Sequence, residues 1–247
     1  MSAVNFALGA LAGAAATAVA ADAYPSMMPT LGLNRPQIEL KYFDFAGAAE
    51  KVRFTLLMGG VSFKDTRVSF KEWAELKPTT KYGQLPEMYL NGETKPYAQS
   101  GAMLRFAGAI TGLVPKDPIK ALSVDEAIGL DEDLRREMRP SIVISYDQTI
   151  KPKEKARKIK ELREKLVADQ IPKFLSHFEQ MLGNSDYLCG SSPTIADAQF
   201  LVTCRWLGSG VLDHIPADIM SKYPKITAFR ERMETTPEIA AYLNKPK

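Results

Sequence analysis

The pattern of apolar residues changes near Pro115, and this change limits the fold more than any other feature of the sequence. Before it, short alternating segments typical of strands lie between helical segments. After it, every regular segment is helix-length and mainly amphipathic. A chain of 247 residues is long enough for two units with separate cores. We therefore expect an α/β domain over residues 37–113 and an all-helical domain over residues 114–247.

The first half contains strand and helix signals in a distinctive order. Residues 37–45, QIELKYFDF, alternate apolar and polar side chains, and Asn91-Gly92 is a strong hairpin signal. Strands are expected at 37–45, 61–70, 85–90 and 94–99, with helical segments at 48–60, 71–78 and 100–113. A βαβ unit, then a hairpin, then a helix is the thioredoxin-like arrangement.

The second half is predicted to contain helices only. They are expected at residues 123–149, 155–182, 194–211 and 225–236. Thr194 and Asp197 have the spacing of a capping box, in which each side chain bonds the backbone of the other. We interpret this pair as part of the folding of the helical domain and not as part of a ligand site.

The first 21 residues carry no charged side chain, and a linker rich in proline and glycine follows up to residue 36. A segment of this length can cross a bilayer, and Gly9 and Gly13 have the GxxxG spacing of paired membrane helices. A removed targeting segment and a disordered or surface helix are the alternatives. We expect residues 1–22 to tether the protein to a membrane or to direct it to an organelle, and otherwise a cytoplasmic location.

Composition excludes several classes of protein. The net charge of +3 is too small for a nucleic-acid-binding domain. The two cysteines, Cys189 and Cys204, are not in a CxxC pattern, and the chain has only two histidines. We therefore expect neither a disulfide framework nor a metal site, and we expect Cys204 to be buried among apolar neighbours.

Pro86 and the pair Gln99-Ser100 point to a ligand. A proline inside a strand-like run indicates an edge or a special bend, because proline lacks the N–H that a ladder needs. A serine at the start of a helix adds a hydroxyl to free N–H groups, an arrangement that favours a carboxylate. Ser100 as an ordinary helix cap and Pro86 as an edge residue remain the alternative.

Six segments now identify a family resemblance that covers residues 37–247. They are KYFDFAGAAEKVR, EWAELKP, GQLPEMYLNG, AQSGAMLRF, LVADQIPKFLSHFEQML and YLCGSSPTIADAQF. In this order and spacing the chain resembles the glutathione S-transferases, most closely the sigma class that includes glutathione-dependent prostaglandin D synthases. The resemblance implies a homodimeric detoxification enzyme that uses glutathione to conjugate or isomerise small apolar electrophiles.

The resemblance also implies site residues. A hydroxyl that donates to sulfur favours the thiolate, and Tyr42 aligns with the tyrosine that does this. Pro86 would be a cis-proline that turns the backbone of Leu85 toward the cysteinyl part. The γ-glutamyl end of glutathione would contact Gln99 and Ser100. The glycine carboxylate would contact Trp73, Lys77 and Gln84. Asp125 would reach the glutathione bound by the partner subunit. The alternatives are a core aromatic for Tyr42, a buried Trp73 beside a solvated Lys77, and a surface role for Asp125.

One position departs from the family pattern. Where sigma enzymes often have an arginine that tunes the thiolate, this chain has Ala48. The departure leaves a second hypothesis open, a catalytically weak structural subunit of a membrane complex.

Two further regions are of interest. The electrophile is expected between residues 43–47 and the fourth helix, where the candidates are Arg135, Met138, Arg139 and Ile142, although exposed helix surface explains the arginines equally well. Residues 151–165 hold eight basic and three acidic residues, which indicates a solvated face or docking to anionic lipid.

Overall fold

The computed structural model describes residues 36–245. The predictions for residues 1–22 therefore lie outside the described part of the chain. Within residues 36–245, no helix combines the length and the apolar character that crossing a membrane requires.

A four-stranded mixed sheet organises the first domain, as predicted. Its strands are β1 (Ile38–Phe43), β2 (Lys64–Val68), β3 (Glu87–Leu90) and β4 (Tyr97–Ala98), in the spatial order β2-β1-β3-β4. β1 pairs in parallel with β2 and antiparallel with β3, and β3 pairs antiparallel with β4. This is the thioredoxin-like topology.

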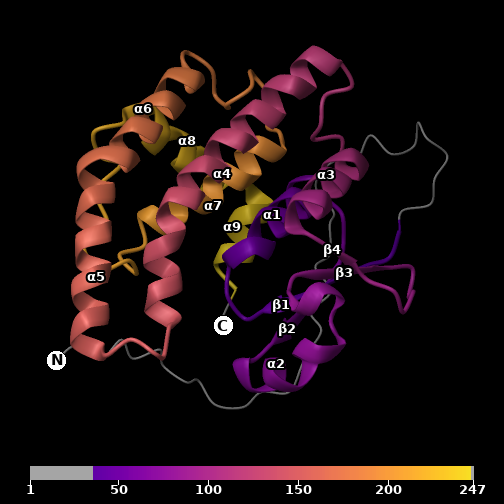
Figure 1. The fold of residues 1–247 in the computed structure, drawn as a ribbon. Coiled ribbons are helices and arrows are strands. Elements are labelled where there is room, and N and C mark those ends of the chain that lie inside the picture. The colour runs from indigo at the N-terminus through magenta and orange to yellow at the C-terminus, as the bar shows by residue number, and fades with distance from the viewer. Residues whose placement is uncertain (1–35, 246–247) are drawn as a thin grey trace.

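Helices cover both faces of the sheet (Figure 1). α1 (Glu50–Met58) connects β1 to β2 and packs against α3 (Ser100–Thr111) on the side of the helical domain. α2 (Phe70–Leu76) lies on the opposite side of the sheet. Short 3₁₀ turns occur at Gly47–Ala49, Lys77–Thr79 and Lys81–Gly83.

The second domain is helical, as predicted, with some different boundaries. Its helices are α4 (Pro118–Tyr146), α5 (Pro152–Lys165), α6 (Ile171–Leu182), α7 (Ile195–Leu207), α8 (Pro224–Thr235) and α9 (Pro237–Leu243). α4 begins at Pro118 and not at residue 123, because Asp117 accepts two backbone N–H bonds as N-cap and proline suits the first helical position. α9 is not among the helices predicted from the sequence.

The helix predicted over residues 155–182 is divided in the structure. A π-helical turn, Leu166–Gln170, separates α5 from α6, and the N–H of Ile171 donates to the carbonyl of Leu166. Pro172 has no N–H to continue the α-helical hydrogen bonding, and the helix widens into a π-helical turn just before it.

The two domains share one continuous hydrophobic core, with α1 packed against both α3 and α7. At the start of α7, Asp197 accepts hydrogen bonds from the N–H groups of Thr194 (2.7 Å) and Leu188 (2.8 Å). The predicted capping box is therefore confirmed. Cys204 is fully buried, as expected.

Candidate active site

Tyr42 lies near the end of β1 with its ring buried between two other aromatic rings. The ring centroids of Phe43 and Phe45 are 5.3 and 5.4 Å from that of Tyr42, and both contacts are edge-on. The hydroxyl of Tyr42 accepts a hydrogen bond of 3.1 Å from the N–H of Ala48. No residue of the described part accepts the hydroxyl's own proton. The hydroxyl is therefore available as a donor.

Gly47 permits this arrangement. Its φ is +48°, and a Cβ at this position would lie 2.4 Å from the hydroxyl oxygen of Tyr42. Only glycine has both the backbone freedom and the lack of a side chain that this close approach needs.

Arg53 of α1 fixes the segment that carries Ala48. Its buried guanidinium donates to the carbonyls of Phe45 (3.2 Å) and Ala46 (3.3 Å), and its Cζ lies 5.8 Å from the Tyr42 ring centroid. The same group pairs with Glu50 (2.9 Å) and Asp65 (3.1 Å). Arg53 was not among the predicted site residues, although it stands out in the sequence as a charged residue inside the mainly apolar run VRFTLLM.

The absence of an arginine at position 48 therefore does not leave the hydroxyl without a donor. The backbone N–H of Ala48 provides one, and no side chain is required for that bond. Burial raises the pKa of Tyr42, while the Ala48 hydrogen bond and the nearby Arg53 charge act in the opposite direction. Near neutral pH the hydroxyl is protonated and can donate a hydrogen bond.

Strand register places Tyr42, Pro86 and Gln99 in one row across the end of the sheet. Lys41 is opposite Glu87, and Glu87 is opposite Ala98. Because both pairings are antiparallel, the next residues in these rows are Tyr42, Pro86 and Gln99. The structure thus brings Tyr42 into one row with residues 44 and 57 positions later in the sequence.

The Leu85–Pro86 peptide bond is cis, as the resemblance implies. Glu87, which follows it, is buried and accepts hydrogen bonds from the N–H of Lys81 (2.6 Å) and the hydroxyl of Tyr89 (2.9 Å). These bonds hold the turn before Gln84, so Glu87 is a positioning residue that sequence reasoning missed.

The start of α3 presents free donors at the end of this row. Gln99 is the N-cap with φ of +75°, Ser100 is the first helical residue, and no side chain caps the helix. The alternative that Ser100 is an ordinary cap is therefore wrong. Free N–H groups at a helix start favour an anion, and a backbone in this uncommon region is typical of a functional site.

Trp73 and Lys77 lie on the α2 side of the sheet. Trp73 is half-buried with its ring edge-on to Phe43 at 5.4 Å, and the N–H of Lys77 donates to the carbonyl of Trp73. Within the described residues, five predicted ligand side chains form no hydrogen bond or ion pair. They are Trp73, Lys77, Gln84, Gln99 and Ser100.

Asp125 does not join this group. It lies on α4 and pairs with Arg105 of α3 at 2.9 Å, with both side chains about half exposed. The predicted contact of Asp125 with the glutathione of a partner subunit stays a prediction, as does the alternative of a surface role.

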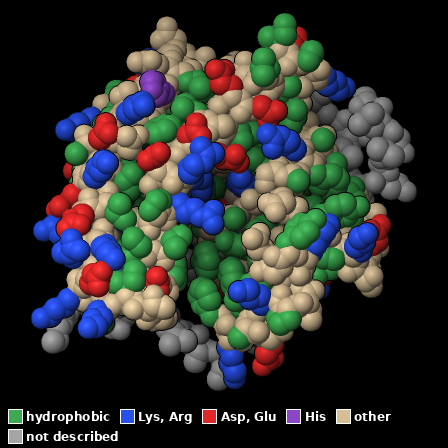
Figure 2. All heavy atoms as spheres, viewed as in Figure 1, with side chains coloured by type: hydrophobic (Ala, Val, Ile, Leu, Met, Phe, Trp, Pro, Cys, Tyr) green, Lys and Arg blue, Asp and Glu red, His purple; other side chains and the backbone are tan. Residues whose placement is uncertain are grey.

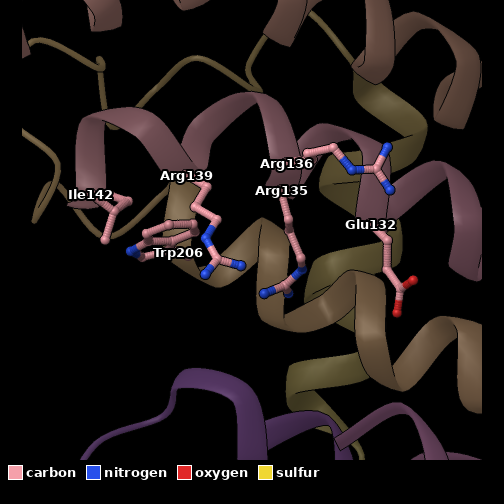
Figure 3. A pocket seen from close by; sticks show the side chains of 6 residues that line it. All are labelled: Glu132, Arg135, Arg136, Arg139, Ile142 and Trp206. Carbon is pink, nitrogen blue, oxygen red and sulfur yellow. The ribbon is translucent and has the colours of Figure 1, made fainter. Parts of the chain in front are cut away.

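The expected electrophile region coincides in part with a pocket of about 340 Å³ on α4. It is lined by Glu132, Arg135, Arg136, Arg139, Ile142 and Trp206 (Figure 3). Met138 does not line it, because this side chain is buried in the core at 1% exposure. The prediction for Met138 was wrong, and Trp206 of α7 was missed.

Comparison with known proteins agrees with this geometry. Residues 142–246 match the model of the C-terminal domain of glutathione S-transferases. Glutathione S-transferase 1 of Ascaris suum is 32% identical over 215 residues, which cover 86% of this chain and 98% of that protein. The chain belongs to the glutathione S-transferase family. Within this family, hematopoietic prostaglandin D synthase of Gallus gallus is 28% identical over 214 residues, 85% of this chain and 96% of that one.

The fold of this glutathione S-transferase also matches solved structures of the family. The structure of prostaglandin synthase D of Nilaparvata lugens has a TM-score of 0.73 at 28% identity, and the match covers 86% of this chain and 100% of that chain. A glutathione S-transferase from Ascaris lumbricoides gives a TM-score of 0.69 at 29% identity and covers 86% of this chain and 98% of that one.

Proposed function

We propose that this chain is a glutathione transferase in which the hydroxyl of Tyr42 holds the sulfur of glutathione as a thiolate. The observation that carries the proposal is the state of this hydroxyl, which accepts the Ala48 N–H and has no acceptor for its own proton among the described residues. A donor aimed at sulfur favours the charged form and lowers the thiol pKa. The name of the related transferase from Ascaris suum supports the same co-substrate.

The unpartnered side chains around Tyr42 account for the rest of the tripeptide. The start of α3 with Gln99 and Ser100 suits the α-carboxylate of the γ-glutamyl residue. Trp73 and Lys77, with Gln84, suit the glycine carboxylate, because an indole N–H and an ammonium group are donors without acceptor sites. The backbone of Leu85 before cis-Pro86 suits the cysteinyl amide.

The chemical step follows from a stabilised thiolate. The thiol proton leaves to water, and the sulfur pair forms a new S–C bond with the electrophilic carbon. In a substitution the leaving group departs with its bonding pair, and in an addition the neighbouring carbon takes a proton from water. Isomerisation of a small electrophile begins with the same attack and ends with release of glutathione. Nothing in the comparisons favours the alternative of a non-catalytic subunit.

Two wider features of the proposal concern the whole protein. We expect a homodimer, as the family resemblance implies, and a membrane or organellar location through residues 1–22. Neither feature is needed for the chemistry at Tyr42.

Replacing Tyr42 with phenylalanine tests the proposal. The variant is expected to bind glutathione with unchanged affinity by calorimetry and to lose about 10²-fold in kcat/KM for a conjugation reaction. Tyr97→Phe is the matched control, because Tyr97 lies on β4 with its ring half exposed and is expected to keep full activity. Unchanged turnover in Tyr42→Phe would show that the role given to Tyr42 is wrong.

A further inference from the structure

The pocket on α4 has an unusual lining for a site that receives apolar molecules. Three of its six lining residues are arginines, while Trp206 and Ile142 provide an apolar wall. In Figure 3, Arg135, Arg139 and Trp206 extend from α4 and α7 into the space in front of the β1–α1 segment. A volume of about 340 Å³ is sufficient for a small organic molecule.

A contact between α4 and α1 places this pocket beside the segment before α1. At one end of the lined stretch, Glu132 lies 3.7 Å from Lys51 of α1. Lys51 is three residues from Ala48, whose N–H donates to the Tyr42 hydroxyl. The pocket therefore faces the segment that carries Tyr42 and Ala48.

The three arginines differ in how far their charge is already satisfied. Arg136 is exposed at the rim and pairs with Asp133 at 2.5 Å. Arg135 pairs through Nε with the buried Asp131 at 2.7 Å and donates through Nη2 to the carbonyl of Gln199, which leaves Nη1 unused. Arg139 forms no ion pair or hydrogen bond with any residue of the described part. Arg139 is thus the cation that is free for a ligand.

Nearby acids do not neutralise Arg139. Glu132 is directed to Lys51, Asp131 also accepts the hydroxyl of Thr203, and Asp133 is used by Arg136. Arg135 and Arg139 are four residues apart and so lie on the same face of α4, where their planar groups can together bind one carboxylate or sulfonate.

The surface around the pocket has the same mixed character. Figure 2 shows Lys and Arg side chains gathered around a hollow over α4, with hydrophobic side chains along the groove below it. An occupant with an anionic group at one end and an apolar body would match both parts.

We propose that this pocket selects electrophiles that are amphipathic organic anions, with the anionic group bound by Arg139 and Arg135 and the apolar body against Trp206 and Ile142. The inference rests on the proposed function, because it names the substrate class of the same site. It does not concern glutathione, whose binding residues lie at the sheet end.

The test uses ethacrynic acid, an aryl vinyl ketone with a remote oxyacetate group, and its methyl ester. In both, the thiolate sulfur bonds to the terminal alkene carbon and the neighbouring carbon takes a proton from water, so the chemistry is the same and only the charge differs. Arg139→Gln in the full chain is expected to lower kcat/KM for the acid about tenfold, the lower range for a charged hydrogen bond at an exposed site. For the ester the change is expected to stay within about twofold.

Arg157→Gln is the matched control. Arg157 is an exposed arginine of α5, outside the pocket, and pairs with Glu161 at 2.6 Å. This variant removes the same charge, and its kcat/KM values for the acid and the ester are expected to equal those of the original protein. An equal loss for acid and ester in Arg139→Gln, or no loss for the acid, would overturn the proposal.

A binding measurement separates this inference from the proposed function. Anilinonaphthalene sulfonate, titrated by fluorescence without glutathione, is expected to bind about tenfold more weakly to Arg139→Gln and equally to Arg157→Gln. Equal affinity for all three proteins would overturn the anion site even if conjugation is fast. Selective weakening in Arg139→Gln together with no conjugation would support the anion site and contradict the proposed function.

Discussion

At the scale of single residues, the close approach of Gly47 to Tyr42 is the most demanding contact in the site. A side chain at position 47 would have to displace the phenol, because its Cβ would overlap both the hydroxyl and the ring. The Ala48 N–H bond depends on the same geometry. Activity should therefore be sensitive to one methyl group here.

Gly47→Ala is expected to lower kcat/KM about 10²-fold through displacement of Tyr42. It should also lower the free energy of unfolding by about 1–3 kcal/mol, because alanine is strained at a φ of +48°. Gly92→Ala is the control: it has a φ of +74° with nothing within 4 Å of the added Cβ. Gly92→Ala should lower the free energy of unfolding by about 1 kcal/mol and leave turnover unchanged. Equal activities of the two variants, measured by steady-state kinetics, would contradict the role given to Gly47.

The candidate site residues that could be predicted are those whose residue type and position match the family pattern. Tyr42, Pro86 and Gln99 were named before the sheet register placed them in one row. The Ala48 donor was not predictable, because a backbone N–H looks the same in every sequence. Glu87 and Trp206 were missed since their roles depend on contacts between distant elements.

At the scale of elements, Arg53 ties α1 to β2 and to the β1–α1 segment. Its partners are Asp65 and Glu50, and Tyr242 of α9 extends the network by donating to Glu50 at 3.0 Å. Removing one partner of a buried ion pair is destabilising, because the other charge stays buried with less compensation.

Arg53→Met is expected to lower the free energy of unfolding by about 3 kcal/mol, since the buried Glu50 would lose its cation and the partly buried Asp65 would keep only Arg67. Chemical denaturation measures this change. Arg157→Met, on the exposed face of α5, is expected to lower the free energy of unfolding by less than about 1 kcal/mol. A comparable loss in both variants would show that the network around Arg53 does not stabilise the domain.

The same network predicts an alkaline loss of stability. Burial, and next the Glu50 carboxylate, raise the pKa of Tyr242 to about 12, against 10.0 for the ordinary phenol. Below pH 10 both folded and unfolded chains hold this proton, so the contribution is fully present there. Between pH 10 and 12 only the folded chain holds it, and the free energy of unfolding falls by at most about 1.4 kcal/mol per pH unit.

Tyr242→Phe isolates this effect, because all other titrating groups are the same in both proteins. The variant should be less stable at pH 7 by about 1–2 kcal/mol, through the lost bonds to Glu50 and Arg67, and should lose less stability above pH 10. Parallel curves of unfolding free energy against pH would contradict the buried phenol assignment.

At the scale of the whole molecule, the switch from mixed to helical pattern was sufficient to predict the two-part architecture. The exact helix boundaries depend on local features. The Asp117 N-cap could be recognised in the sequence. The π-helical turn before Pro172 could not, because the sequence does not show how the backbone adjusts to the hydrogen bond that proline cannot form. α9 is only seven residues long, which is too short for a clear periodic signal.

Deletion of residues 1–22 tests the proposed tether. The shortened protein is expected to leave the membrane fraction on flotation with lipid vesicles, while its kcat/KM stays within about twofold, because the site residues all lie within residues 36–245. Retention of the shortened protein on vesicles would locate membrane binding elsewhere, with the basic face of α5 as the next region to vary.

The central claim is most directly tested by titrating the sulfur of bound glutathione through its ultraviolet thiolate absorbance. The chain's own thiols do not interfere, because burial raises the pKa of Cys189 to about 11 and that of Cys204 well above its ordinary value. In the original protein the pKa of bound glutathione should lie about 1–2 units below that of the free tripeptide, and in Tyr42→Phe it should return close to the free value. The same thiolate pKa in both proteins, or no binding of glutathione to either, would contradict the account.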